Sequence, residues 1–229
     1  MSRERGVVIA VDGPSGAGKS TISRALSKRL GYLEIDTGAM YRAMAWLARD
    51  SDLDFDNHQA VQEFSRNAEV ELQLDNGTTR VLANGRDVTS EIRTPEISML
   101  TSKISALAPV REAMMILQRR MGAKGGVVLD GRDIGTVVFP DAELKFFLSA
   151  SAEERGRRRF LELQGKGIQT TLEETIQDVV QRDKQDSERE LAPLCQAPDA
   201  IPIDSTGLSI EQVIALMEQL CQERQQERI

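Results

Sequence analysis

The amino-acid sequence predicts a three-layer α/β/α fold, in which helices cover both faces of a central five-stranded parallel sheet. Five short segments rich in β-branched and aliphatic residues are the expected strands: residues 7–11, 32–35, 127–130, 144–148 and 200–204. They are apolar throughout rather than alternating, which is typical of strands buried on both faces. Helical patterns separate them, and a repeated order of strand then helix indicates a parallel sheet.

Two helices in the second half of the chain have clear start signals. Thr171 with Glu174, and Ser209 with Gln212, match the capping-box pattern in which the first and fourth residues bond to each other's backbone. An apolar stripe at helical spacing follows Ser209 and predicts a helix that faces the core: Ile210, Val213, Ile214, Met217, Leu220 and Cys221.

Residues 51–98 have a different pattern. Apolar residues alternate with polar ones over residues 70–74, and turn signals follow at Asn76-Gly77 and Asn84-Gly85. We therefore expect a small antiparallel β insertion within the larger α/β fold.

Composition narrows the functional classes. A net charge of -7 argues against a nucleic-acid surface, which normally carries a basic excess. The two cysteines, Cys195 and Cys221, and the single histidine, His58, lack the spacing of a metal cage, and we expect no disulfide. The apolar run 7–11 is too short for a signal peptide, so we expect a soluble cytoplasmic protein with no membrane segment.

A phosphate-binding loop directly follows the first predicted strand and precedes a predicted helix. Its residues fit the P-loop pattern G-x-x-x-x-G-K-[ST]: Gly13, Pro14, Ser15, Gly16, Ala17, Gly18, Lys19 and Ser20. Thr21 follows and is expected to contact the ATP phosphates as well. Inward-pointing N–H groups and the helix N-terminus hold polyphosphate in such loops. We expect Lys19 to reach the β- and γ-phosphates of ATP and Ser20 to ligate Mg²⁺.

Two arginine-bearing motifs follow later strands. Asp36-Thr37-Gly38-Ala39-Met40-Tyr41-Arg42 comes after the second strand, and Asp130-Gly131-Arg132-Asp133 after the third. Open α/β sheets bind ligands at the carboxyl ends of their strands. These motifs therefore indicate a second anionic ligand beside the polyphosphate.

Together with the phosphate loop, these segments resemble the bacterial cytidylate kinases, a family of P-loop nucleoside monophosphate kinases. The resemblance covers nearly the whole chain, with further matches at 91–94, 110–112, 135–141 and 182–186. It implies transfer of the γ-phosphate of ATP to CMP or dCMP, with Mg²⁺, by a monomer. Family members often have glycine where this chain has Ser20 and serine where it has Thr37.

The resemblance also implies roles for single residues. Arg42 and Arg132 would clamp the acceptor phosphate, because a guanidinium meets phosphate oxygens bidentately. The remaining residues of the implied CMP site would read the cytosine, hold the ribose or line the site: Ser102, Arg111 and Asp133 for the base, Arg182 and Asp186 for the ribose, and Thr37 and Tyr41. Arg182 and Asp186 are four residues apart on a predicted helix. Without the resemblance, this spacing would predict an ion pair on the helix surface.

A mobile lid is implied between the fourth strand and the Gly165-Lys166-Gly167 turn. The lid contains four arginines: Arg155, Arg157, Arg158 and Arg159. We expect Arg157 and Arg158 to act on the transferring phosphoryl group, together with Lys19 and Arg132 from outside the lid. Asp130 would either support Mg²⁺ through water or organise Arg132.

These expectations divide the chain by task. The core would comprise about 1–50, 103–150 and 190–229, with the CMP-binding insertion at about 51–102 and the lid at about 151–170. Two other functions stay open: a kinase for another acceptor, such as UMP or a small metabolite, and a P-loop NTPase switch. The chain lacks the Asn-Lys-x-Asp motif of guanine-specific switches.

Overall fold

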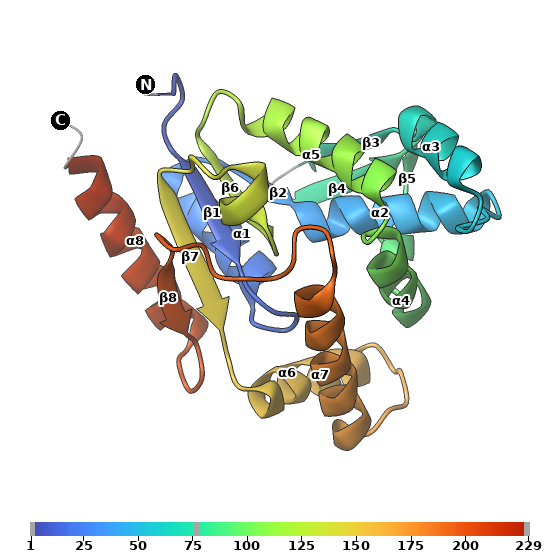
Figure 1. Cartoon of the computed structure of the whole chain (residues 1–229). Helices are drawn as coiled ribbons and strands as arrows, with labels where there is room; N and C mark the ends of the chain where they lie inside the picture. Colours follow the sequence, from blue (N-terminus) through green and yellow to red (C-terminus); the bar gives the residue numbers. More distant parts are fainter. Residues whose placement is uncertain (1–2, 76–77, 227–229) are drawn as a thin grey trace. The chain divides into compact units, whose positions relative to one another are not determined.

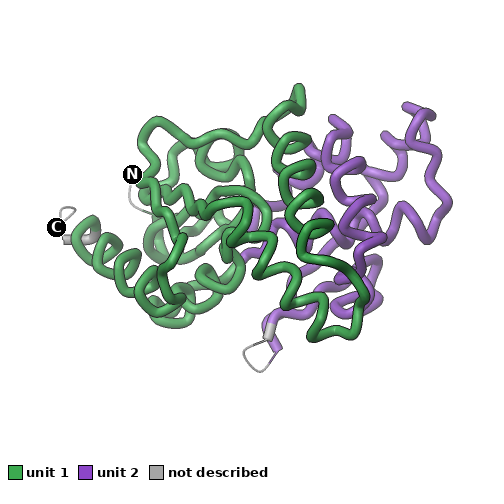
Figure 2. The backbone as a smooth tube through the Cα atoms, turned by 90° about the horizontal axis from the view of Figure 1, so that it is seen from below, with its two compact units in different colours: residues 1–34, 122–229 green, residues 35–121 purple. Residues whose placement is uncertain are grey.

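The computed structural model describes residues 3–75 and 78–226. The backbone forms two compact units (Figure 2). The first unit is Met1–Glu34 with Gly122–Ile229, and the second is Ile35–Met121.

The first unit is built on a five-stranded parallel sheet in the order β2-β6-β1-β7-β8 (Figure 1). The edge strand β2 continues along the chain into the second unit. Every predicted strand is found within one residue of its expected bounds, which confirms the predicted sheet: β1 Val8–Asp12, β2 Leu33–Asp36, β6 Val127–Gly131, β7 Leu144–Ser149 and β8 Ile201–Asp204.

Position in the sheet explains why these strands are apolar. The inner strands β1 and β6 are buried at every residue, whereas the edge strand β8 is buried at Ile203 only. In the register of β1 with β6, Val11 lies opposite Asp130 and Asp12 opposite Gly131. The carboxyl ends of these two strands, which precede two of the predicted motifs, are therefore adjacent.

Two helices contribute to a buried hydrophobic cluster of the first unit. Helices α1 (Lys19–Leu30) and α8 (Ile210–Gln226) pack with the sheet strands into one buried cluster. The members with the least exposed side chains include Ile9, Leu26, Phe146, Met217 and Cys221. Burial raises the pKa of the Cys221 thiol to about 12, so this cysteine is an inert core residue.

Two further helices follow β7 and pack against each other: α6 (Ala152–Gly165) and α7 (Leu172–Glu188). Gly156 permits their close approach, because a Cβ at this position would lie 2.4 Å from Cγ1 of Ile176. The predicted capping box at the start of α7 is confirmed, with Thr171 and Glu174 each accepting from the other's backbone N–H.

The capping box predicted before α8 is also confirmed. The backbone N–H of Ser209 donates to Oε1 of Gln212 at 2.9 Å, and the N–H of Gln212 donates to Oγ of Ser209 at 3.2 Å.

The second unit contains the predicted antiparallel insertion. Strands β3 (Val70–Asp75) and β4 (Thr78–Ala83) are antiparallel, and β4 pairs with β5 (Arg86–Asp87). Asn84 and Gly85 have φ of 47° and 76°, as a tight turn between β4 and β5 requires. The turn predicted at Asn76-Gly77 lies outside the described residues.

Helices make up the rest of this unit: α2 Thr37–Asp50, α3 His58–Asn67, the 3₁₀ turn η1 Glu91–Arg93, α4 Pro95–Ile104 and α5 Ala108–Gly122, whose last residue belongs to the first unit. Over the two described ranges of the chain, no helix has the length and apolar character needed to cross a membrane.

We expect Leu26→Ala to lower the free energy of unfolding by about 2–5 kcal/mol, because it removes a side chain that is fully buried between α1 and the sheet. Urea unfolding followed by circular dichroism would measure the loss. Leu161→Ala is the matched control, since Leu161 is 52% exposed and its loss should change stability by less than about 0.5 kcal/mol. Equal effects of the two changes would contradict the assigned core.

Candidate active site

The phosphate loop occupies residues 13–18, between β1 and α1. Gly13 has a φ of 148°, and a Cβ there would lie 1.9 Å from the carbonyl oxygen of Leu148. Gly16 and Gly18 are left-handed, at 76° and 90°. The loop therefore curls where only glycine fits, and Gly18 delivers it directly into α1, with Thr21 exposed in the first turn.

Lys19 is buried, and its Nζ donates to the carbonyl oxygen of Pro14 at 2.7 Å. Burial, together with the positive charge of Arg132, lowers the pKa of its ammonium group well below the usual value, against the pull of Asp130. A buried cation next to further arginines is stabilised by an anion. This electrostatic environment suits a bound polyphosphate.

Ser20 and Asp130 form an oxygen pair beside the loop. Oγ of Ser20 donates to Oδ2 of Asp130 at 2.7 Å. Mg²⁺ prefers oxygen ligands and commonly combines one or two protein groups with waters and substrate phosphates. No cluster of three or more His, Cys, Asp or Glu side chains suitable for a metal occurs among residues 3–75 and 78–226. The Ser20 hydroxyl and the Asp130 carboxylate are oxygen groups of the kind that such an ion takes from a protein.

Asp12, at the end of β1, is a residue that the sequence analysis missed. Its carboxylate accepts from the N–H groups of Ile134 and Gly135, at 2.9 Å and 2.7 Å. Burial raises its pKa to about 6; these two hydrogen bonds oppose the shift and the nearby Asp133 adds to it. Asp12 thus anchors the π-helical turn η2 (Ile134–Val138), which directly follows Arg132 and Asp133.

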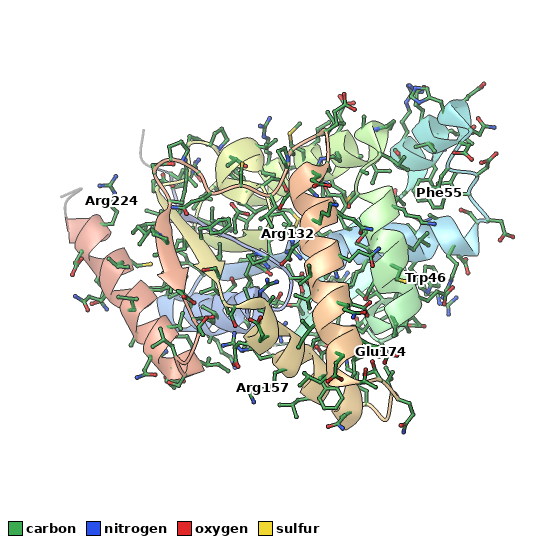
Figure 3. All side chains as sticks on the ribbon, turned by 60° about the horizontal axis from the view of Figure 1, so that its bottom comes forward. Trp46, Phe55, Arg132, Arg157, Glu174 and Arg224 are labelled. Atoms are coloured by element: carbon green, nitrogen blue, oxygen red, sulfur yellow. The ribbon has the colours of Figure 1, made fainter. Side chains whose placement is uncertain are left out.

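An ion-pair network joins the loop after β6 to helix α7. Nε of Arg132 lies 2.8 Å from Oδ2 of Asp186, and Arg132 lies beside α7 in Figure 3. Arg189, also missed from the sequence, lies 3.5 Å from Asp133 and 3.9 Å from Asp186. Its one signal in the sequence was its position three residues after Asp186; in the structure it directly follows the last residue of α7. The network brings Arg132, Asp133 and Asp186 together.

Asp186 is not part of a solvated surface pair. Its side chain is 9% exposed and pairs with Arg132 from a different segment of the chain. Burial opposes its ionisation, but the charges of Arg132 and Arg182 outweigh burial and lower its pKa. The surface interpretation of the Arg182 and Asp186 spacing is therefore wrong for Asp186.

The two arginines selected in the lid differ in their surroundings. The side chain of Arg157, labelled in Figure 3, is 57% exposed. It pairs with Glu154 on its own helix at 3.0 Å. Arg158 also pairs with Glu154, and its Nη2 donates to the carbonyl oxygen of Ser205 at 3.0 Å. Its Nη1 lies 3.9 Å from the position that a Cβ on Gly18 would take. Their action on the phosphates stays a prediction.

Arg155, which the sequence analysis set aside, contacts the phosphate loop directly. Its Nη1 donates to the carbonyl oxygen of Ser15 at 2.9 Å, and its side chain is 7% exposed.

The second unit carries the other predicted CMP-site residues. Asp36 accepts from the N–H of Ala39 at 2.7 Å, which caps α2, and it pairs with Arg42 at 3.2 Å. Among the described atoms, Nε of Arg42 is buried without a hydrogen-bond partner. On the same helix, Thr37 is buried and Tyr41 is half-buried.

Arg111 of α5 lies over the ring of Tyr41, with its guanidinium carbon 5.8 Å from the ring centre, and donates to the carbonyl oxygen of Ser105 at 3.0 Å. Arg111 is buried, whereas Ser102 on α4 is half-buried. A buried guanidinium that lies over an aromatic ring and bonds to a carbonyl oxygen has few orientations.

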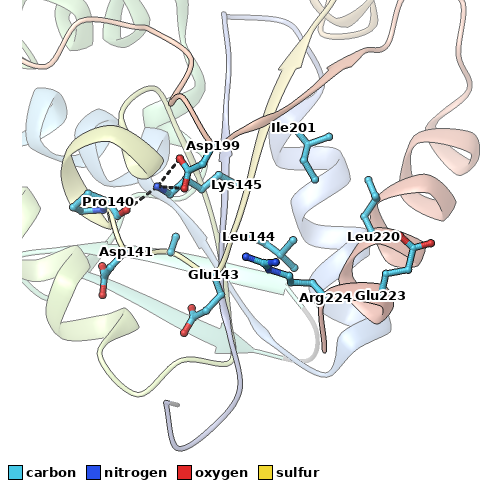
Figure 4. Close-up of a pocket in the computed structure, with 11 residues that line it drawn as sticks. Pro140, Asp141, Glu143, Leu144, Lys145, Asp199, Ile201, Leu220, Glu223 and Arg224 are labelled. Carbon is cyan, nitrogen blue, oxygen red and sulfur yellow. Dashed lines mark hydrogen bonds and ion pairs between the residues drawn. The ribbon is translucent and has the colours of Figure 1, made fainter. Parts of the chain in front are cut away.

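A pocket of about 530 Å³ lies elsewhere in the first unit (Figure 4). Leu144 and Ile201, the first residues of β7 and β8, help to line it, so it lies at the amino ends of these strands. Within it, Nζ of Lys145 is bound by the carbonyl of Pro140 and the carboxylate of Asp199. Its lining includes none of the predicted site residues, and we do not assign it to the active site.

Comparison with known proteins gives the family. The family model described as cytidylate kinase matches residues 9–223. The chain belongs to the cytidylate kinase family. It is 62% identical over 222 residues to the cytidylate kinase of Citrifermentans bemidjiense, covering 97% of this chain and 95% of the relative. It is 57% identical to that of Geobacter sulfurreducens, covering 96% and 95%.

A solved structure shares the fold. An uncharacterized protein from Eubacterium ventriosum aligns with a TM-score of 0.50 at 11% identity, over 95% of this chain and 98% of that one. This likeness concerns the fold alone.

We expect the Asp12 carboxyl group of this cytidylate kinase family member to titrate near pH 6 rather than near 3.8. Because the folded state holds this proton more tightly than the unfolded state, the contribution of Asp12 to stability is complete below about pH 4 and is lost as pH rises through 6. Carboxyl ¹³C chemical shifts would give the midpoint, with Asp12→Asn assigning the signal. A midpoint near 4 would contradict the burial of this group.

Proposed function

We propose that this protein transfers the γ-phosphate of ATP to CMP, and to dCMP, to give ADP and CDP or dCDP. The observation that carries the proposal is the cytidylate kinase match over residues 9–223, which includes the phosphate loop and both arginine-bearing motifs.

The donor would bind to the phosphate loop. Backbone N–H groups of Gly16, Ala17 and Gly18 and the start of α1 would hold its phosphates, and Lys19 would reach the β- and γ-phosphates. The buried ammonium of Lys19 supports this role, since an anion offsets the cost of its burial. Ser20, with Asp130 through water, would hold Mg²⁺, which supplies charge neutralisation on the phosphates when it is bound.

The acceptor would use arginines for its phosphate and buried polar groups for its base. The unpartnered Nε of Arg42 and the half-buried guanidinium of Arg132 support a phosphate clamp. The proposed CMP-binding residues are Thr37, Tyr41, Arg42, Ser102 and Arg111 on the second unit, and Arg132, Asp133, Arg182 and Asp186 on the first.

Specificity would come from matching the cytosine edge. Its exocyclic amine needs an acceptor, which the Asp133 carboxylate can supply, and its ring N3 and O2 need donors, which Arg111 can supply. A site with buried hydrogen-bonding groups discriminates strongly, because a wrong base leaves those groups unpaired.

No general base is required, because the attacking oxygen belongs to a phosphate that is already anionic at neutral pH. The barrier comes from bringing two highly charged groups together. Catalysis would depend on in-line positioning and on positive charge from Lys19, Arg132, Arg157 and Arg158. Closure of the lid, at about residues 151–170, would exclude water as a competing acceptor.

Other parts of the proposal rest on the resemblance and the composition. We propose that the protein is a cytoplasmic monomer that acts in pyrimidine nucleotide metabolism. Its core would comprise about 1–50, 103–150 and 190–229, and its CMP-binding insertion about 51–102.

The decisive experiment is ADP formation from Mg-ATP with each nucleoside monophosphate in turn, and without acceptor. We expect fast turnover with CMP and dCMP and little with AMP, GMP or UMP. Lys19→Ala, folded by circular dichroism, should lose most of this turnover. ADP release without acceptor would indicate an NTPase. Faster turnover with another monophosphate would show that this nucleotide, and not CMP, is the acceptor.

We expect Asp133→Ala to raise the KM for CMP by roughly 10- to 100-fold while the KM for ATP changes far less, since about 1–3 kcal/mol is lost when a buried hydrogen-bonding group loses its partner. Steady-state kinetics with each substrate varied would measure both constants. Asp178→Ala, which removes an exposed carboxylate from α7, is the matched control. A parallel rise in both KM values would count against base recognition by Asp133.

A further inference from the structure

The backbone of Ser15 in the phosphate loop is held from outside the loop by two charged side chains. Its N–H donates to Oδ1 of Asp183 at 3.4 Å, and its carbonyl oxygen accepts from Nη1 of Arg155 at 2.9 Å. Arg155 belongs to α6 and Asp183 to α7. Both backbone polar groups of Ser15, which belong to the two peptide units on either side of its Cα, are thus bonded to the helices that follow β7.

The two side chains also fix each other. Nη1 of Arg155 lies 2.6 Å from Oδ2 of Asp183, and Nε of Arg155 donates to the carbonyl oxygen of Ala150 at 2.8 Å. The Arg155 side chain is 7% exposed and that of Asp183 is 21% exposed. A guanidinium that is buried and bonded at three points has one orientation, so it presents a fixed donor to Ser15.

Gly16 lets the loop approach this pair. Its φ is 76°, and a Cβ there would lie 3.1 Å from Cβ of Arg155 and 3.3 Å from its carbonyl oxygen. The outer surface of the loop therefore packs directly on the Arg155 backbone. Any shift of Arg155 would be transmitted to the peptides of Ser15 and Gly16.

We propose that Arg155 and Asp183 form a clamp that sets the geometry of the phosphate loop, and that they are positioning residues for the phosphate donor. The proposal deepens the function proposed above and rests on it. Phosphate binding by backbone N–H groups requires that their dipoles point at the anion before it arrives. A loop with glycines at positive φ at 13, 16 and 18 has little rigidity of its own, and the clamp supplies it from outside.

The charges of Asp183 and Arg155 predict how each substitution changes ATP affinity. Asp183 places a carboxylate next to a loop that is meant for a polyphosphate, and Arg155 neutralises it. Loss of Arg155 alone would leave this carboxylate unpaired and repulsive towards ATP, whereas loss of both charges would remove the repulsion. The clamp therefore predicts that the two substitutions are not additive.

The test is the dissociation constant of Mg-ATP, measured by calorimetry without acceptor, for the full-length protein and the variants Arg155→Met, Asp183→Asn and the double variant. We expect Arg155→Met to weaken ATP binding by roughly tenfold or more, and Asp183→Asn by less. The double variant should bind ATP more tightly than the product of the two single effects predicts.

Kinetics separate positioning from general damage. The KM for ATP should rise in the single variants while the KM for CMP changes by less than about threefold, and Arg155→Lys, which keeps the charge, should recover part of the affinity. Asp178→Asn on α7 is the control and should change neither constant. If Arg155→Met fails to fold, the dissociation constants of Mg-ATP for Arg155→Lys and Asp183→Asn are compared with that of the unchanged protein instead.

Unchanged ATP affinity in the folded variants, additive effects, or equal rises in both KM values would overturn the clamp. Failure of the proposed function would give a different result, because a wild-type protein inactive on CMP would still bind ATP, and the calorimetric comparison would stand without the acceptor.

Discussion

The buried ammonium of Lys19 is the feature on which the rest of the site depends. A cation removed from water is costly unless negative charge or hydrogen bonds replace its hydration. Here the carbonyl of Pro14 and the charge of Asp130 do so in part, while Arg132 works against them. The incomplete compensation makes this end of the sheet a place where a polyanion is favoured.

Carboxylates organise the positive groups around this site. Asp186 pairs with Arg132, Asp133 with Arg189, and Asp183 with Arg155. Each pair joins two segments that are distant in the sequence. Because a guanidinium held by a carboxylate has few orientations, these pairs convert flexible arginines into fixed donors. The same pairing limits the mutual repulsion of several cations in one small region.

The parallel sheet explains why these groups meet. The strands β1 and β6 are adjacent and in register at Val11 with Asp130, so the phosphate loop and the arginine-bearing motif leave the sheet side by side. Asp12 then bonds to the backbone beyond that motif, at Ile134 and Gly135. Membership of the cytidylate kinase family gives this arrangement a chemical purpose, the handling of two phosphorylated ligands.

The sequence by itself determined the elements whose signals are local. Buried strands, capping boxes and the phosphate loop follow from apolar runs, short spacings and glycines, and all were found within a residue of their expected positions. Only the tertiary structure decided which arginine of α6 contacts the loop, since neighbouring arginines have the same chemistry and differ only in the helix face that they occupy. It likewise decided the partner of Asp12, which lies 122 residues away, because no short pattern encodes a contact of that range.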